Sequence, residues 1–369
     1  MAMAAVNVDI LDCFPEMILI EILSYLNVQE LIRTARVCRR WRLLVKDQRL
    51  WRNVDLSTWK RVTSRVLWTL LRQYFGRGLC SLHLQGLLQS ARGGSFLTEP
   101  WLHALGSKCP RLRRLSLTLT DLRGLHSCSL LPSSLKVLEL HSCELPPGFF
   151  THSPPAPARP DSNSTENKHP TPSTSSGPSV ETLILDNVPS FTDQHLQSLS
   201  SWGHLHHLEL RNLLRVTIAG VMGCAPPGPN SLLHLTHLEL ESSSRQQMMA
   251  LGLANGGWAG LERLALGGRE VTPGLLRLNQ LPGLRWLQLR GCRVAETMLM
   301  RVFCHPALKG LRTLEFLQVE FVIEDERDKN EAENRSQSCR VPEIRRALAN
   351  LLPDCSMLFT QCTVTVNPD

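Results

Sequence analysis

One pattern, Leu-x-x-Leu-x-Leu, recurs along most of this chain and limits its possible folds more than any other feature. Full copies begin at Leu79, Leu112, Leu135, Leu205, Leu235, Leu261 and Leu284. Copies with one substitution begin at Val180 and Leu311. Most neighbouring copies begin 23 to 33 residues apart. The greater part of the chain is therefore a series of similar units.

The spacing within each copy predicts a short strand. Successive side chains of a strand point to opposite faces, so the leucines enter a shared core and the residues between them do not. Helical segments such as Pro100–Leu105 and Thr192–Leu199 return the chain to the next strand. One unit cannot bury its own apolar face, so the units must stack. The sequence predicts an α/β solenoid, a curved leucine-rich-repeat array with short parallel strands on the concave face.

The residues just before, within and after each Leu-x-Leu should line that concave face. Glutamates recur at the middle position and form an acidic stripe bordered by Arg and His. One tryptophan stands where an exposed ring could anchor a partner. The candidate binding residues are Arg114, Glu139, His207, Glu209, His237, Glu239 and Trp286. An ordinary solvated sheet surface remains the alternative for each of them.

Two segments interrupt the array. Residues 146–179 are dense in Pro, Ser and Thr and poor in large aliphatic side chains, so we expect a disordered loop. Residues 324–340 begin with a strongly acidic run and are expected to form a solvated loop. Residues 341–369 are expected to cap the solenoid with a helix over Pro342–Leu352 and a terminal strand.

The stretch Phe14–Trp51 carries more apolar surface than its own fold can bury. Pro15 and Glu16 are typical of a helix start. Eight of the ten residues from Met17 to Leu26 are apolar or aromatic, whereas a surface helix needs about three or four per two turns. A partner protein best explains the surplus. An ordinary three-helix core without a partner is the alternative.

A second helix is expected from the Asn27–Glu30 cap, with helical spacing continuing to Cys38. The whole order resembles an F-box: a Pro-led helix ending near Ser-Tyr-Leu, then Val37-Cys38-Arg39-x-Trp41, then Leu50-Trp51. Phe14-Pro15 replaces the usual Leu-Pro of that family. Cysteines at the repeated Leu-x-x-Cys step, Cys143 and Cys292, resemble the cysteine-containing repeats that commonly follow an F-box.

This resemblance to the F-box/leucine-rich-repeat family implies docking on Skp1, the adaptor of SCF (Skp1-cullin-F-box) ubiquitin ligases. Carried over by position, the Skp1-binding residues are Phe14, Pro15, Ile18, Ile22, Leu23, Leu26, Val37 and Trp41. The repeats would bind protein substrates through the candidate concave residues. The chain would then be a non-catalytic receptor subunit that holds substrates for ubiquitination. The alternative is a repeat scaffold that binds partners without delivering ubiquitin.

The expected domains follow from these features: an F-box over 9–55, repeats over 56–323 with the 146–179 interruption, an acidic loop over 324–340 and a cap over 341–369. No Gly-rich phosphate loop or catalytic constellation is recognisable, and no cofactor is expected. His204, His206, His207, His234 and His237 could suggest zinc. However, His207 and His237 are strand positions on adjacent repeats, where polar residues simply face water or a ligand, so no metal is expected.

Charge and cysteine content bear on the partners. Between Arg33 and Arg65 there are eleven Arg or Lys against two Asp. A basic segment can bind nucleic acid, but few aromatics are interleaved, and solvated helix faces or an acidic partner are favoured. Asp9, Asp12 and Glu16 stand where a signal peptide would be basic. We expect a cytoplasmic or nuclear protein with no membrane association, whose twelve cysteines are buried thiols rather than disulfides.

Overall fold

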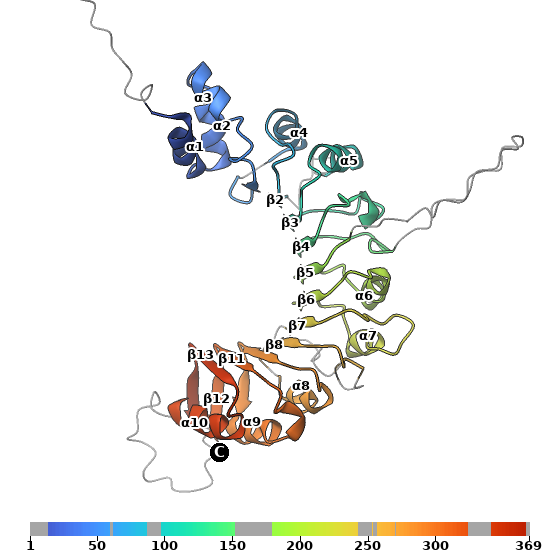
Figure 1. The fold of residues 1–369 in the computed structure, drawn as a ribbon. Helices are drawn as coiled ribbons and strands as arrows, with labels where there is room; N and C mark the ends of the chain where they lie inside the picture. The colour runs from blue at the N-terminus through green and yellow to red at the C-terminus, as the bar shows by residue number, and fades with distance from the viewer. Residues whose placement is uncertain are drawn as a thin grey trace, which may run out of the picture.

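The computed structural model describes residues 14–59, 62–86, 97–151, 179–242, 253, 257–269, 271–323 and 341–366. These residues form a group of N-terminal helices followed by an open arc of stacked repeats (Figure 1). The strands follow one another along the inner side of the arc, and the helices of the repeats lie on its outer side. The predicted fold class is confirmed.

The N-terminal helices are α1 (Glu16–Ser24), α2 (Val28–Thr34) and α3 (Arg39–Leu44). Helix α2 begins with a reciprocal cap. The Asn27 side chain accepts from the Glu30 amide at 3.0 Å, and the Glu30 carboxylate accepts from the Asn27 amide at 2.8 Å.

The helical spacing predicted to reach Cys38 stops earlier. The Val37 amide bonds the Thr34 carbonyl three residues back, which tightens the end of α2 into a turn. Cys38 is extended, and its sulfur accepts from the Trp41 amide as the N-cap of α3.

Within the described residues, eleven parallel strands form one sheet and follow one another in chain order along the arc. The strands are β1 (Asn53–Asp55), β2 (Ser81–Gln85), β3 (Arg114–Thr118), β4 (Val137–His141), β5 (Thr182–Asp186), β6 (His207–Arg211), β7 (His237–Glu241), β8 (Arg263–Gly267), β9 (Trp286–Arg290), β11 (Thr313–Leu317) and β13 (Ser356–Thr360). Strands β2 to β9 and β11 are the predicted ones. Equivalent residues of neighbouring strands pair directly, so each strand position forms a column across the sheet.

The sheet begins before the predicted boundary between the F-box and the repeats. Strand β1 pairs with β2 through Val54 and Leu82, although the sequence placed residues 53–55 in the F-box. Trp51 is fully buried, stacks on Tyr74 at 4.5 Å between ring centroids, and donates its indole N–H to the Val45 carbonyl. The N-terminal helices and the first repeat therefore share one continuous core.

Short helices return the chain on the outer side of the arc. They are α4 (Ser64–Gln73), α5 (Glu99–Lys108), α6 (Asp193–Ser198), α7 (Ile218–Gly223), α8 (Thr272–Leu275) and α9 (Glu296–Phe303), with 3₁₀ turns at Cys128–Leu130, Leu199–Ser201, Leu278–Gln280 and Pro306–Leu308. The predicted return segments correspond to α5 and to α6 with the 3₁₀ turn after it.

The repeat leucines and cysteines fill the space between strands and helices. The leucines of the Leu-x-x-Leu-x-Leu copies are at most 3% exposed. Cys143 and Cys292 are also buried, and burial raises the pKa of each thiol to about 12. The Cys143 thiol donates to the Leu117 carbonyl at 3.3 Å. Their expected packing role is confirmed.

The first residues of the expected disordered loop are part of the core. Phe149 and Phe150 are 1% and 0% exposed. The Phe150 ring lies edge-on to Phe191 and Trp202, with centroids 5.7 and 5.5 Å away. The prediction for 146–179 was wrong at this end, because it weighed aliphatic content and overlooked two aromatic rings. Residues 152–178 lie outside the described residues.

The C-terminal segment adds helix α10 (Val341–Leu351) and strand β13 at the end of the large sheet. A second sheet joins β10 (Arg293–Ala295), β12 (Glu320–Ile323) and β14 (Thr363–Val366). The cap thus contributes strands to two sheets. The acidic segment 324–340 lies outside the described residues. Within the described residues, no helix has the length and apolarity that a bilayer crossing requires.

Candidate functional site

Helix α1 is apolar on two sides. Leu19, Ile20 and Leu23 face the helical core and are at most 7% exposed. Ile18 and Ile22, one helical turn apart on the other side, are 46% and 50% exposed. An aliphatic row left in water on a helix whose opposite side is already packed is typical of a docking surface.

The other predicted docking residues fall into three groups. Phe14, Pro15 and Val37 are exposed. Leu26 and Trp41 are half-buried and pack against the core. Leu23 is 1% exposed, so its assignment to the docking surface is corrected. Because both sides of α1 are apolar, a row at i, i+4 spacing does not show which side faces inward.

Three further apolar residues of this region are exposed and were not predicted: Met17, Tyr25 and Leu43. The Arg49 guanidinium lies 2.9 Å from the Met17 sulfur. Arg40 of α3 donates to the Phe14 carbonyl at 2.9 Å, which ties α3 to the start of α1. We define the α1 docking face as Phe14, Met17, Ile18, Ile22 and Tyr25.

The concave face of the sheet carries three columns of side chains. The candidate residues stand in two of them: Arg114, His207 and His237 before the first leucine of each strand, and Glu139 and Glu209 between the leucines. A third column follows the second leucine. Its charged members are His141, Asp186, Arg211, Glu241 and Arg290. The same two-residue alternation marks this column in the sequence.

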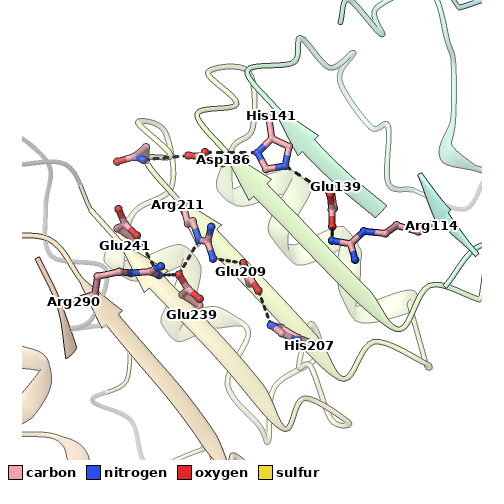
Figure 2. A network of polar contacts seen from close by, with 11 residues as sticks. Arg114, Glu139, His141, Asp186, His207, Glu209, Arg211, Glu239, Glu241 and Arg290 are labelled. Carbon is pink, nitrogen blue, oxygen red and sulfur yellow. Dashed lines mark hydrogen bonds and ion pairs between the residues drawn. The ribbon is translucent and has the colours of Figure 1, made fainter. Parts of the chain in front are cut away.

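Ion pairs connect these columns in two groups (Figure 2). In the first group, Arg114 pairs with Glu139, and the His141 nitrogens lie 4.0 Å from Glu139 and 3.6 Å from Asp186. The Asn212 amide also donates to Asp186 at 3.1 Å. Burial opposes ionisation of Glu139, but the interactions with His141 and with the positive charge of Arg114 outweigh it and lower the pKa of Glu139 to about 2.

The second group runs from β6 to β9. The Glu209 carboxylate lies 2.9 Å from His207 and 2.6 Å from Arg211, and Arg211 lies 2.7 Å from Glu239. Arg290 pairs with Glu239 and lies 3.3 Å from Glu241 (Figure 2). Although burial opposes it, hydrogen bonding to His207 and the charge of Arg211 lower the pKa of Glu209.

Small residues on β8 make the contact between β7 and β9 possible. Ala265 and Gly267 stand between Glu239 and Glu241 on one side and Gln288 and Arg290 on the other. A Cβ atom at Gly267 would lie 2.8 Å from the Glu241 side chain. Arg290 therefore reaches across β8 to the carboxylates of β7.

These pairs correct the predicted acidic stripe. Glu139 and Glu209 are 5% and 7% exposed, and the Glu239 side chain is 12% exposed. Each carboxylate is neutralised by a neighbouring arginine, and two of those arginines stand in the third column. The stripe is a structural network of the sheet rather than a free acidic surface.

The remaining concave residues differ in accessibility. The rings of His207 and His237 stack with centroids 5.3 Å apart. Burial is the larger cause, and the charge of His207 the smaller one, that together lower the pKa of His237. Trp286 is half-buried, and its indole N–H donates to Glu315 at 3.1 Å. Leu358, in the middle column of β13, is 56% exposed. Apolar side chains are therefore accessible at the C-terminal end of the concave face.

The buried thiols of the repeats resist ionisation. Buried thiols such as Cys109 and Cys224 have their pKa raised by burial to about 11 and 12, which disfavours the reactive thiolate. In the part of the chain that the structure describes, no group of three or more His, Cys, Asp or Glu side chains could hold a metal ion.

Comparisons with known proteins agree with this organisation. A model of the F-box-like family matches residues 11–57, which contain α1 to α3 and β1. F-box/LRR-repeat protein 12 from Homo sapiens is 36% identical over 304 residues, which cover 75% of this chain and 87% of that protein. The Mus musculus protein of the same name is 35% identical over 305 residues, with the same coverage. An F-box protein from Saccharomyces cerevisiae is 28% identical over 96 residues, which cover 26% of this chain and 15% of the yeast protein.

Proposed function

Since the chain belongs to the F-box/LRR-repeat family, we propose that it is the substrate-recognition subunit of an SCF ubiquitin ligase. The α1 docking face would bind Skp1, and Skp1 would connect the chain to a cullin. The concave face of the repeats would bind the protein to be ubiquitinated. The chain itself would contribute binding and no catalysis.

One observation carries this proposal: the exposed row of α1. Ile18 and Ile22 are about half exposed although the other side of the same helix is packed. Removing such a row from water is favourable by about 25 cal/mol per Å² of apolar area. A helix face of this kind gains free energy only when a partner covers it, so binding of an adaptor explains its composition.

Ubiquitin transfer would then depend on proximity. A substrate held on the concave face has its lysines close to the ubiquitin-charged enzyme of the same complex, at a high effective concentration. The accessible apolar groups at the C-terminal end, Trp286 and Leu358, are the proposed anchors. The bond from Trp286 to Glu315 at 3.1 Å holds the indole ring in place before a partner arrives.

Co-purification of the full chain with Skp1 and a cullin tests the proposal. We expect both to be recovered with the wild type and clearly less of each with an Ile18→Ala/Ile22→Ala variant. Leu214→Ala/Leu233→Ala is the matched control, because these leucines are 64% and 68% exposed on the repeats. Recovery of Skp1 without a cullin would favour a scaffold. Recovery of neither with the wild type would contradict the proposal.

A further inference from the structure

The last strands of the concave face carry a patch that is mostly apolar. Trp286 of β9 and Leu317 of β11 are half-buried, and Leu358 of β13 is 56% exposed. Glu315, also half-buried, stands in the middle column between Gln288 and Leu358. We call Trp286, Glu315, Leu317 and Leu358 the C-terminal patch. It combines one carboxylate with three apolar side chains.

Two neutral side chains of β9 hold the Glu315 carboxylate in place. The Trp286 indole N–H donates to Oε1 at 3.1 Å, and the Gln288 amide donates to Oε2 at 2.9 Å. An ionised carboxylate can accept about four hydrogen bonds, so each oxygen keeps a further acceptor position. The carboxylate is therefore oriented before any partner binds and can still accept two hydrogen bonds.

Glu315 differs from the glutamates of the concave network in its partners. Glu139, Glu209 and Glu239 each pair with an arginine. Arg290 of β9 reaches the carboxylates of β7 instead of Glu315. Within the described residues, no lysine, arginine or histidine pairs with Glu315, whose two partners are neutral. The negative charge of this patch is therefore balanced by water and not by the chain.

The bond between Trp286 and Glu315 limits which partner can cover the patch. Because the indole N–H is joined to the carboxylate, a partner that buries the ring also removes water from Glu315. Burying a carboxylate without a counterion is strongly unfavourable. A neutral or acidic surface is therefore rejected, and a suitable partner must bring a cation to Glu315.

We propose that the C-terminal patch binds an arginine side chain of the captured protein together with a neighbouring apolar side chain. A guanidinium donates two parallel hydrogen bonds to a carboxylate and stacks on aromatic rings, whereas the ammonium of lysine is a point charge. The two open acceptor positions of Glu315 and the ring of Trp286 suit the guanidinium. Leu358 lies one strand from Glu315, about 4.8 Å across the sheet, and would contact the apolar side chain.

This assignment rests on the proposed function, which places the captured protein on the concave face. It adds the class of sequence that is recognised, an arginine close to an apolar residue. The charge offered to a basic partner is then one carboxylate at the C-terminal end of the array. The glutamates of the predicted acidic stripe take no part, because arginines of the chain already neutralise them.

The test begins with the purified full chain and a degenerate library of short peptides, and the retained peptides are identified by mass spectrometry. We expect arginine to be enriched, with an apolar residue within two positions of it. An enriched peptide is then compared with the same peptide carrying citrulline, the neutral isostere of arginine. Glu315→Gln should weaken binding of the arginine peptide about tenfold or more, because hydrogen bonds between charged groups are lost. It should leave binding of the citrulline peptide unchanged, as a direct pair requires.

Two further variants complete the test. Glu262→Gln is the matched control, because Glu262 is exposed just before β8 and its change removes the same charge outside the concave columns. Leu358→Ala alters a side chain that is 56% exposed, so the fold should tolerate it. It should weaken the arginine and citrulline peptides equally, by about threefold, because only the apolar contact is lost.

The outcomes are distinct. A loss specific to the arginine peptide in Glu315→Gln, with an unchanged melting temperature, supports the assignment, and so does an equal loss of both peptides in Leu358→Ala. Four results overturn it: no enrichment of arginine, equal enrichment of lysine, equal loss in Glu262→Gln, or self-association of the chain that Glu315→Gln abolishes. Co-purification of each variant with Skp1 and a cullin is measured separately, so failure of the patch and failure of the proposed receptor function are distinguishable.

Discussion

Truncation of the exposed row of α1 gives the sharpest test of how this chain binds its adaptor. The change is Ile18→Ala/Ile22→Ala, and alanine favours the helical conformation. The two side chains are 46% and 50% exposed. Complete burial of an isoleucine is worth about 1.5–3 kcal/mol, so covering the exposed half contributes about 1 kcal/mol for each residue.

The double truncation should therefore remove about 2 kcal/mol of binding free energy, which corresponds to a Kd about thirtyfold weaker. The measurement is titration of purified Skp1 into the full chain by calorimetry. The buried halves of the same side chains also support the fold, so a thermal melt of each variant is needed beside the titration. Only a loss of affinity in a folded variant counts.

The matched control is Leu214→Ala/Leu233→Ala, which removes comparable exposed aliphatic surface from the repeats. We expect its Kd to stay at the wild-type value. A Kd for Ile18→Ala/Ile22→Ala within about threefold of wild type, or an equal loss in the control, would refute the assignment of this row as the contact.

Four other predictions test the rest of the structure. Leu23→Ala should cost about 2–5 kcal/mol of unfolding free energy because the side chain is buried, and a chemical melt measures the loss. Phe150→Ala should cost about 3–5 kcal/mol, since its ring packs against two other aromatic rings; an unchanged denaturation midpoint would show that this segment contributes no core. The pKa of Glu139 is lowered to about 2 in the fold, so its contribution to stability is present above its unfolded pKa of about 4.5 and is lost as the pH falls toward 2. Glu139→Gln should therefore make the unfolding free energy less dependent on pH between about 4.5 and 2. Identical dependence on pH in the variant and the wild type would contradict the pairing. Trp286→Ala should weaken capture of ubiquitinated proteins by about 2 kcal/mol if the ring is an anchor, and pull-downs that match wild type would place capture elsewhere.

The regular features of the repeats could be predicted because they depend on local periodicity. A Leu-x-Leu step buries both leucines in any stack, so the positions of β2 to β9 followed from the sequence. The columns also followed, because parallel units of similar length keep the same register. The aromatic pair Phe149 and Phe150 was missed, since a composition argument averages over a segment and two rings are enough to pack its start.

The pairing of charges could not be predicted from the same periodicity. Arg290 contacts carboxylates on β7 although β8 lies between them, and this depends on two small residues, Ala265 and Gly267, standing in the same columns. A surface pocket lined by Arg49, Arg52, Arg111 and Arg113 likewise joins the segment after α3 to the segment before β3. Both contacts bring together residues from separate units, so they appear only when the stacking is known.

If the adaptor covers the exposed side of α1 as proposed, the two apolar sides of this helix would couple the level of this protein in a cell to that of its adaptor. A chain without a partner displays Ile18, Ile22 and Tyr25 to water, and exposed apolar patches of this kind promote self-association and recognition by chaperones. Binding of the adaptor stabilises the folded chain by mass action. Synthesis in excess of the adaptor would then yield an orphan subunit with a short lifetime, so the adaptor supply would set the upper limit of receptor abundance.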